Sequence, residues 1–300
     1  MTKRYFAGNV VTAMVTPFDK DLNVDYAKAE KLANYLADNG SDAILLAGTT
    51  GESPTLTHEE EIELLKVVKT SIGNKAQIIM GAGSNCTKTA VKMSETAQKG
   101  GADAILSVVP YYNKPSQQGM KAHFGAVAEA VDIPVMLYNI PGRTGVDMAP
   151  TTIIELASKH ENIFAVKQSN GNLDLVTEII QDAPEGFVLY SGDDSLTLPM
   201  LALGGVGVVS VASHLIGNQI QEMIKAFKAG QTVEAQALHH KYYPVFKKIF
   251  MAPNPIPVKA ALAKKGIVEE NVRLPLTKLD ETQKDELFGV IDYIFQGAKL

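Results

Sequence analysis

The sequence has little cysteine, no long apolar segment and no excess of basic residues. Cys86 is the single cysteine in 300 residues, so the chain can form no intrachain disulfide bond, which fits a reducing compartment. No apolar run approaches the roughly 20 residues needed to cross a bilayer. The net charge of −5 disfavours nucleic acid and anionic lipid as partners. We therefore expect a soluble cytoplasmic protein with no nucleic-acid or membrane partner.

The N-terminal segment loosely resembles a targeting signal. Lys3 and Arg4 precede a partly apolar stretch, as in a signal peptide. Gly8, Asn9 and Pro17 interrupt this stretch, and no cleavage site of small residues follows it. We interpret the segment as the first strand of the fold.

The chain shows a regular alternation of two patterns. Short runs rich in Val and Ile are typical of buried strands, and longer segments with helical spacing of apolar residues are typical of helices. Strands are predicted at Val10–Thr16, Ala43–Ala47, Gln77–Gly81, Ala104–Val109, Val135–Asn139, Phe164–Gln168, Val188–Ser191 and Val208–Val211. Helices are predicted at 25–39, 57–72, 87–99, 117–130, 150–159, 172–182, 195–203 and 216–228.

Eight strand–helix units in one unbroken series favour a closed parallel barrel. A doubly wound open sheet would usually break the series or insert a second domain. We predict an α/β protein with a (β/α)₈ TIM barrel over residues 1–229. Residues 230–300 are predicted to form a C-terminal α-helical extension, with helices at 231–250, 258–264 and 282–296.

Lys167 is the sharpest candidate for catalysis. Catalytic groups of such barrels lie at the C-terminal ends of the strands, and Lys167 stands there, inside the otherwise apolar sixth strand. Burial disfavours the ammonium form, and a neutral amine is the nucleophile that forms a Schiff base with a carbonyl compound. A lysine paired with a carboxylate for structural reasons is the alternative interpretation.

Two loops that follow strands offer groups for a carboxylate substrate. In Gly48-Thr-Thr-Gly-Glu-Ser, backbone N–H groups can turn toward a small anion, and Thr49 and Thr50 add hydroxyl donors. In Tyr138-Asn-Ile-Pro-Gly-Arg, Tyr138 can relay protons and Arg143 offers a planar fork for a carboxylate. An ordinary turn and a surface ion pair are the structural alternatives.

Signals for a cofactor are weak. Gly81-Ala-Gly lacks the third glycine of a dinucleotide-binding fingerprint, and the six histidines show no metal-ligand spacing. Asp193 and Asp194 end the seventh strand, where many barrels bind phosphate, and two carboxylates there would repel it. We expect no metal, no organic cofactor and no sugar-phosphate substrate.

The motifs taken together are similar to those of one known family. They are Val15-Thr-Pro-Phe, Gly48-Thr-Thr-Gly-Glu-Ser, Pro110-Tyr-Tyr-Asn, Tyr138-Asn-Ile-Pro-Gly-Arg-Thr-Gly, the Lys167 strand, Ser191-Gly-Asp-Asp and Asn254-Pro-Ile-Pro-Val-Lys. Over nearly its whole length the chain resembles the dihydrodipicolinate synthase (4-hydroxy-tetrahydrodipicolinate synthase) family, among the pyruvate-dependent aldolases that include N-acetylneuraminate lyase. Arg143 and the first Thr of the Gly48 motif resemble the synthase branch, since neuraminate lyases typically carry Ser there and lack the Arg.

The resemblance implies a lyase that condenses pyruvate with L-aspartate 4-semialdehyde to 4-hydroxy-tetrahydrodipicolinate, in lysine and diaminopimelate biosynthesis. It implies that Lys167 forms an imine with pyruvate and that Thr50 holds the pyruvate carboxylate. Arg143 is implied to receive the carboxylate of the semialdehyde at the mouth of the site.

The resemblance also implies a proton relay of Tyr138, Thr49 and Tyr112, with Tyr112 supplied by a neighbouring subunit. Gly192 and Val209 are implied to line the site through their backbone. The usual assembly of the family is a homotetramer, a dimer of dimers, and the reaction needs no cofactor.

One departure from the family follows the lysine directly. The family usually has Glu at this position, and here it is Gln168. Neighbours along a strand face opposite sides, so Gln168 is expected to change the outer packing and not the chemistry. Two alternatives stay open: a related aldolase acting on N-acetylneuraminate or a 2-keto-3-deoxy sugar acid, and a non-catalytic barrel that binds a keto acid.

Overall fold

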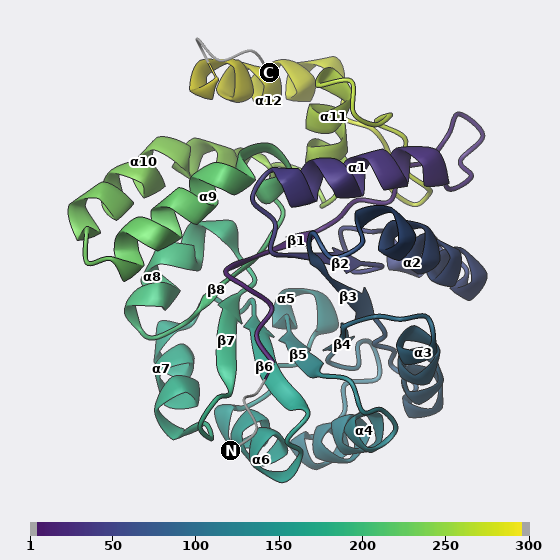
Figure 1. Cartoon of the computed structure of the whole chain (residues 1–300), viewed down its shortest axis with the longest axis vertical. Coiled ribbons are helices and arrows are strands. Elements are labelled where there is room, and N and C mark those ends of the chain that lie inside the picture. The colour runs from purple at the N-terminus through teal and green to yellow at the C-terminus, as the bar shows by residue number, and fades with distance from the viewer. Residues whose placement is uncertain (1–4, 296–300) are drawn as a thin grey trace.

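The computed structural model describes residues 5–295, and its centre is a closed barrel of parallel strands paired in chain order (Figure 1). The strands are β1 (Val10–Ala13), β2 (Ala43–Leu46), β3 (Gln77–Gly81), β4 (Ala104–Val108), β5 (Val135–Asn139), β6 (Ile163–Gln168), β7 (Val188–Ser191) and β8 (Gly207–Ser210). Val11 of β1 pairs with Val209 of β8, which closes the barrel and leaves no exposed sheet edge. The predicted TIM-barrel fold class is confirmed.

Helices form the layer outside the strands (Figure 1). They are α1 (Tyr26–Asp38), α2 (His58–Ile72), α3 (Thr87–Lys99), α4 (Gln117–Glu129), α6 (Pro150–Lys159), α7 (Leu173–Asp182), α8 (Thr197–Ala202) and α9 (Ser213–Lys228). Loops after β2, β5 and β7 contain the short helical turns η1 (Ser53–Thr55), α5 (Pro141–Thr144) and η2 (Asp194–Leu196). The sequence did not predict α5, in which Pro141 takes a first-turn position that needs no N–H and Gly145 ends the turn at φ 75°.

Side chains of the strands alternate between the barrel interior and the side that faces the helices. Val11, Tyr138 and Val209 belong to the cluster inside the barrel. Val166 belongs to the larger cluster between strands and helices, so the next residue, Lys167, faces the interior. Because both faces are buried, the strands show as continuous apolar runs in the sequence.

The first strand is shorter than predicted. β1 stops at Ala13, before the expected Thr16, because the Val15 N–H donates to Nε2 of His214 (3.2 Å) instead of to a neighbouring strand. His214 is fully buried, and its Nδ1 donates to the carbonyl oxygen of Val211 at 2.8 Å. Burial lowers the pKa of this imidazole to about 4, so it stays neutral and ties the loop after β1 to α9.

Three further helices follow α9. α10 (Thr232–Lys248) packs along α9, and α12 (Glu281–Ile294) contacts both α10 and α11 (Ile256–Lys264). α11 and α12 lie beyond α1 on one side of the barrel (Figure 1). α11 begins at Ile256, two residues before the predicted start at 258, so that Pro257 lies in its first turn, where no N–H is needed. Between residues 5 and 295 no helix combines the length and apolar character needed to span a bilayer.

Candidate active site

Lys167 lies at the C-terminal end of β6 with only 6% of its surface exposed. It pairs in the barrel register with Tyr138 of β5, and its Nζ lies 4.1 Å from the centroid of the Tyr138 ring. Among residues 5–295 it forms no ion pair with a carboxylate. The structure therefore does not support the alternative of a lysine buried for an ion pair.

A second buried lysine shows the ion-paired arrangement. Lys259 on α11 is fully buried, and its ammonium is bound by the carboxylate of Glu52 and donates to the carbonyl oxygen of Asn271 at 2.8 Å. A buried ammonium without such partners is costly. Of these two buried lysines, Lys167 is the one whose amine is not engaged by a carboxylate.

Tyr138 also lines a cavity of about 320 Å³. Thr49, from the loop after β2, and Arg143, from α5, line the same cavity. The Nζ atom of Lys167 lies against the ring of Tyr138, which lines the cavity. The predicted site residues that do not line this cavity are Lys167 itself, Tyr112, Thr50, Gly192 and Val209.

Arg143 projects from the short helix α5 at the exposed side of the cavity. The hydroxyl of Thr144 donates to the carbonyl oxygens of Ile140 (3.0 Å) and Val146 (2.9 Å), which fixes this turn. Within the described chain, residues 5–295, Arg143 has no ion-pair partner. Its guanidinium is thus available for a carboxylate ligand that enters the cavity.

Gly192 lies against the side chain of Lys167. A Cβ atom at this position would be 3.1 Å from Cε of Lys167 and 1.8 Å from Oγ of Ser169, so a larger residue would displace both. The N–H of Gly192 donates to the carbonyl oxygen of Gln168 at 2.8 Å. Val209 is buried in the interior wall of the barrel on β8.

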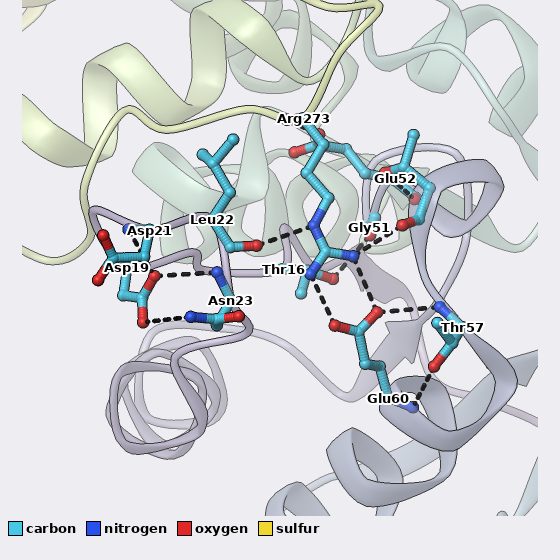
Figure 2. Close-up of polar contacts among 11 residues, drawn as sticks. Thr16, Asp19, Asp21, Leu22, Asn23, Gly51, Glu52, Thr57, Glu60 and Arg273 are labelled. Carbon is cyan, nitrogen blue, oxygen red and sulfur yellow. Dashed lines mark hydrogen bonds and ion pairs between the residues drawn. The ribbon is translucent and has the colours of Figure 1, made fainter.

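Thr50 is held by a residue far along the chain. It is buried, and its Oγ1 accepts a hydrogen bond from Nδ2 of Asn254 at 2.9 Å. The next carbonyl, of Gly51, accepts from Oγ1 of Thr16 at 2.7 Å (Figure 2). Because Thr50 accepts from Asn254, its own hydroxyl hydrogen can be donated to a ligand. No role was predicted for Asn254 from the sequence, although the motif Asn254-Pro-Ile-Pro-Val-Lys begins with it.

Arg273 joins the C-terminal segment to the loop after β2 and to α2 (Figure 2). Its guanidinium donates to both carboxylate oxygens of Glu60, at 2.6 and 2.8 Å, and to the carbonyl oxygens of Leu22 (2.9 Å) and Thr55 (2.7 Å). Its backbone N–H donates to the carboxylate of Glu52 at 3.0 Å. Such a bidentate pair fixes geometry as well as charge. The loop that carries Thr49 and Thr50 is therefore held in place from the C-terminal segment.

Tyr112 points away from this site. It is 90% exposed and has a φ of 72°, a region that aromatic residues rarely adopt. Its neighbour Tyr111 lines the cavity instead. Within a single chain, Tyr112 does not join Tyr138 and Thr49.

Gln168 lies on the opposite side of β6 from Lys167 and is fully buried. Its Oε1 accepts from Nδ2 of Asn139 at 3.1 Å, and the same Nδ2 donates to Asp147 at 2.6 Å. The hydrogen bond of Gln168 thus connects β6 with β5, and Asn139 in turn binds the loop before α6. Among residues 5–295, the side chain of Gln168 makes no hydrogen bond with the lysine amine.

Asp194 does not face a ligand site, contrary to the expectation that both aspartates after β7 would repel phosphate. It is buried and accepts hydrogen bonds from the Ser210 hydroxyl and from the N–H groups of Val211 and Ala212, both at 3.1 Å. Burial raises the pKa of this carboxyl to about 6, against the opposing effect of these hydrogen bonds. Asp194 anchors the end of β8 to the turn after β7.

The geometry and the sequence agree with one family of known proteins. The model of the dihydrodipicolinate synthetase family matches residues 6–293. A 4-hydroxy-tetrahydrodipicolinate synthase from Bacillus velezensis is 51% identical over 284 residues, which cover 95% of this chain and 98% of that protein. The chain belongs to the dihydrodipicolinate synthetase family.

Solved structures of the family share the fold over nearly the whole chain. The enzyme from Cyanidioschyzon merolae, with lysine bound, is 50% identical with a TM-score of 0.95 and covers 97% of this chain and 99% of its own. The chloride-inhibited enzyme from Acinetobacter baumannii, complexed with pyruvate, is 36% identical with a TM-score of 0.93 and covers 96% of this chain and 99% of its own.

In this member of the family, a buried carboxyl also lines the cavity. The side chain of Glu61 is 5% exposed, and its Oε2 lies 3.3 Å from Nδ1 of His58. Burial raises the pKa of Glu61 to about 7, with a smaller contribution from Glu60, while His58 opposes the rise. Such a carboxyl binds its proton more tightly in the folded protein than in the unfolded chain.

Replacing Glu61 with glutamine should therefore change how stability depends on pH. In the wild type, this group makes the free energy of unfolding fall as pH rises from 4.5 to about 7, because in this range the unfolded chain has released a proton that the folded state still holds. Glu61→Gln should be more stable than the wild type by about 1–3 kcal/mol at pH 8, with a smaller difference at pH 5. Urea unfolding at both pH values measures this, and a Glu61→Gln protein that is less stable at pH 8 would contradict it.

Proposed function

We propose that this chain is the lyase 4-hydroxy-tetrahydrodipicolinate synthase, which condenses pyruvate with L-aspartate 4-semialdehyde in lysine and diaminopimelate biosynthesis. Relatives of this name are 50–52% identical over nearly the whole chain. The observation that carries the proposal is Lys167. It is a buried lysine that no carboxylate among residues 5–295 engages, at the end of the barrel where catalytic groups lie.

Three residues would bind the two substrates. Lys167 forms the imine with pyruvate, and the hydroxyl of Thr50, oriented by Asn254, donates to the pyruvate carboxylate. Arg143, which no carboxylate of residues 5–295 engages, binds the carboxylate of the semialdehyde at the mouth of the cavity. A guanidinium there suits a carboxylate better than a polyol, so an assay against N-acetylneuraminate and 2-keto-3-deoxygluconate separates this function from that of the related sugar-acid aldolases.

The remaining predicted residues would handle protons and shape the site. Tyr138 and Thr49 line the same cavity and form the relay with Tyr112 of a neighbouring subunit. Gly192 leaves room for the stem of Lys167, because it has no side chain that would meet Cε of the lysine. Val209 contributes to the interior wall.

The reaction follows from these positions. The neutral amine of Lys167 attacks C2 of pyruvate, and loss of water gives a protonated imine. This imine withdraws electrons, so the relay can remove a proton from the methyl group to give an enamine. The enamine carbon bonds to the aldehyde carbon, whose oxygen takes a proton from the relay. The amino group of the adduct then attacks C2, which closes the ring and releases Lys167. The lysine is the electron sink, and the proposed steps use no metal or organic cofactor.

Borohydride reduction with pyruvate, followed by peptide mass spectrometry, tests this proposal. We expect a pyruvate-dependent adduct on Lys167 and none on Lys259, the matched buried lysine whose ammonium is bound by Glu52. The Lys167→Ala protein should gain no adduct. A wild-type protein without an adduct on Lys167 would overturn the proposal and would favour a barrel that only binds a keto acid.

We propose a homotetramer, a dimer of dimers, as the active assembly. The exposed, outward position of Tyr112 supports this, because a relay that includes Tyr112 then needs a second subunit. We also propose a cytoplasmic location, which suits an exposed free thiol at Cys86. The proposed division of the chain is a barrel over 1–229 and a helical extension over 230–300.

A further inference from the structure

Ser169 places an unpaired hydroxyl at the end of β6, directly after Gln168. Its Oγ is buried and has no hydrogen-bond partner among residues 5–295. Its backbone is held firmly, because its N–H donates to the carbonyl oxygen of Asn139 at 2.9 Å. A buried hydroxyl without a hydrogen-bond partner is unfavourable, and its hydrogen is available to be donated to a ligand.

The hydroxyl of Ser169 lies beside the reactive lysine. The open side of Gly192 is occupied by Oγ of Ser169 and Cε of Lys167, which lie 1.8 Å and 3.1 Å from the point where a Cβ atom would be. Cε is bonded to Nζ, the atom that would attack the keto acid. The hydroxyl of Ser169 therefore lies beside the end of the lysine side chain, close to where the bond between Nζ and C2 of pyruvate would form.

We propose that the Ser169 hydroxyl is a hydrogen-bond donor to the oxygen on C2 of pyruvate while the imine forms. This inference rests on the proposed function and deepens it. When Nζ of Lys167 has added to C2, the keto oxygen has become a hydroxyl group, separated from Cε by two atoms. A serine O–H can donate to that oxygen and weaken its bond to C2.

The step balances without an additional reactant. The lone pair on Nζ forms the C=N bond, the C2–O bond breaks, and the oxygen leaves as water with a proton supplied by the Tyr138 relay. Ser169 donates a hydrogen bond to the departing oxygen and keeps its own proton. It acts before the aldehyde binds, so it affects the first half of the reaction only.

The test separates the two halves of the reaction. In Ser169→Ala, we expect the rate of imine formation, followed by timed borohydride quenching and mass spectrometry, to fall about tenfold. The value of kcat/KM for pyruvate should fall by the same factor, while kcat/KM for aspartate semialdehyde at saturating pyruvate should stay within about twofold. Ser169→Thr, which keeps a hydroxyl, should restore imine formation to within about threefold.

A second serine provides a matched control. The Oγ of Ser107 on β4 is likewise buried and unpaired among residues 5–295, but it belongs to the side of the strand opposite Leu106, which faces the barrel interior. Ser107→Ala should leave the imine rate unchanged. Ser169→Cys, which keeps the volume and weakens the hydrogen bond, serves if Ser169→Ala does not fold.

The outcomes distinguish this inference from the function on which it rests. If the wild type forms no adduct on Lys167, the proposed function fails. If the wild type forms the adduct on Lys167 and Ser169→Ala forms it at the same rate, the proposed role of Ser169 is wrong. The same holds for Ser169→Cys where that variant replaces Ser169→Ala. Equal losses in kcat/KM for both substrates would also overturn it, because they would indicate a general distortion of the site.

Discussion

Replacing Lys259 with methionine should lower the free energy of unfolding by about 3–5 kcal/mol. Methionine keeps the apolar stem that packs near Phe18, whose ring centroid lies 4.1 Å from Nζ, but it removes the ammonium that neutralises the buried Glu52. Because Glu52 lies two residues after Thr50, we also expect a higher KM for pyruvate. Urea unfolding followed by circular dichroism measures the first effect, and steady-state kinetics measures the second.

Two matched variants show whether the charge pair is the cause. Lys259→Met combined with Glu52→Gln removes both charges and should recover much of the lost free energy. Lys264→Met removes a surface ion pair with Asp292, in which the side chain of Lys264 is 25% exposed and that of Asp292 is 54% exposed. This change should lower the free energy of unfolding by less than about 1 kcal/mol. A Lys259→Met protein as stable as the wild type would mean that the pair does not anchor the helical extension to the barrel.

The barrel could be predicted from the sequence because its strands are buried on both faces. A run such as that of β6 is apolar at successive positions, which marks it as a strand, and eight such runs alternate with helical patterns. The strand ends were less predictable. β1 is shortened by a hydrogen bond to His214, about 200 residues away, and no local pattern indicates such a contact. The four residues of α5 are too few to show any periodicity.

In the candidate site, too, some residues could be predicted from the sequence and others could not. Lys167 could be predicted because a charged residue inside an apolar strand is conspicuous. Asn254 could not, because its contact with Thr50 joins residues 204 positions apart. The direction of Tyr112 depends on a positive φ, which the sequence Tyr-Tyr-Asn does not indicate. Ser169 shows no signal either, since its position beside the lysine depends on the close approach of Gly192.

Replacing Lys167 with methionine should lower activity by about 10⁴-fold or more, since no amine is left to form the imine. The same substitution should raise the free energy of unfolding by about 1 kcal/mol, because a buried polar amine that has no carboxylate partner among residues 5–295 gives way to an apolar chain of similar length. Lys259→Met and Lys167→Met thus make the same chemical change at two buried lysines and should shift stability in opposite directions.

That difference in sign follows from what each lysine contacts. The ammonium of Lys259 is paired with the carboxylate of Glu52, and the stability of the fold depends on this pair. The amine of Lys167 lies over the ring of Tyr138 and, in the proposed function, is available to the substrate. Lys167→Arg keeps a cation but not a nucleophile, so it should be as inactive as Lys167→Met. If Lys167→Arg kept more than about a tenth of the activity, the lysine would act through its charge and the Schiff-base mechanism would be wrong. A Lys167→Met protein that is more stable and inactive would support the proposal that the lysine is kept at this position because the reaction needs its amine.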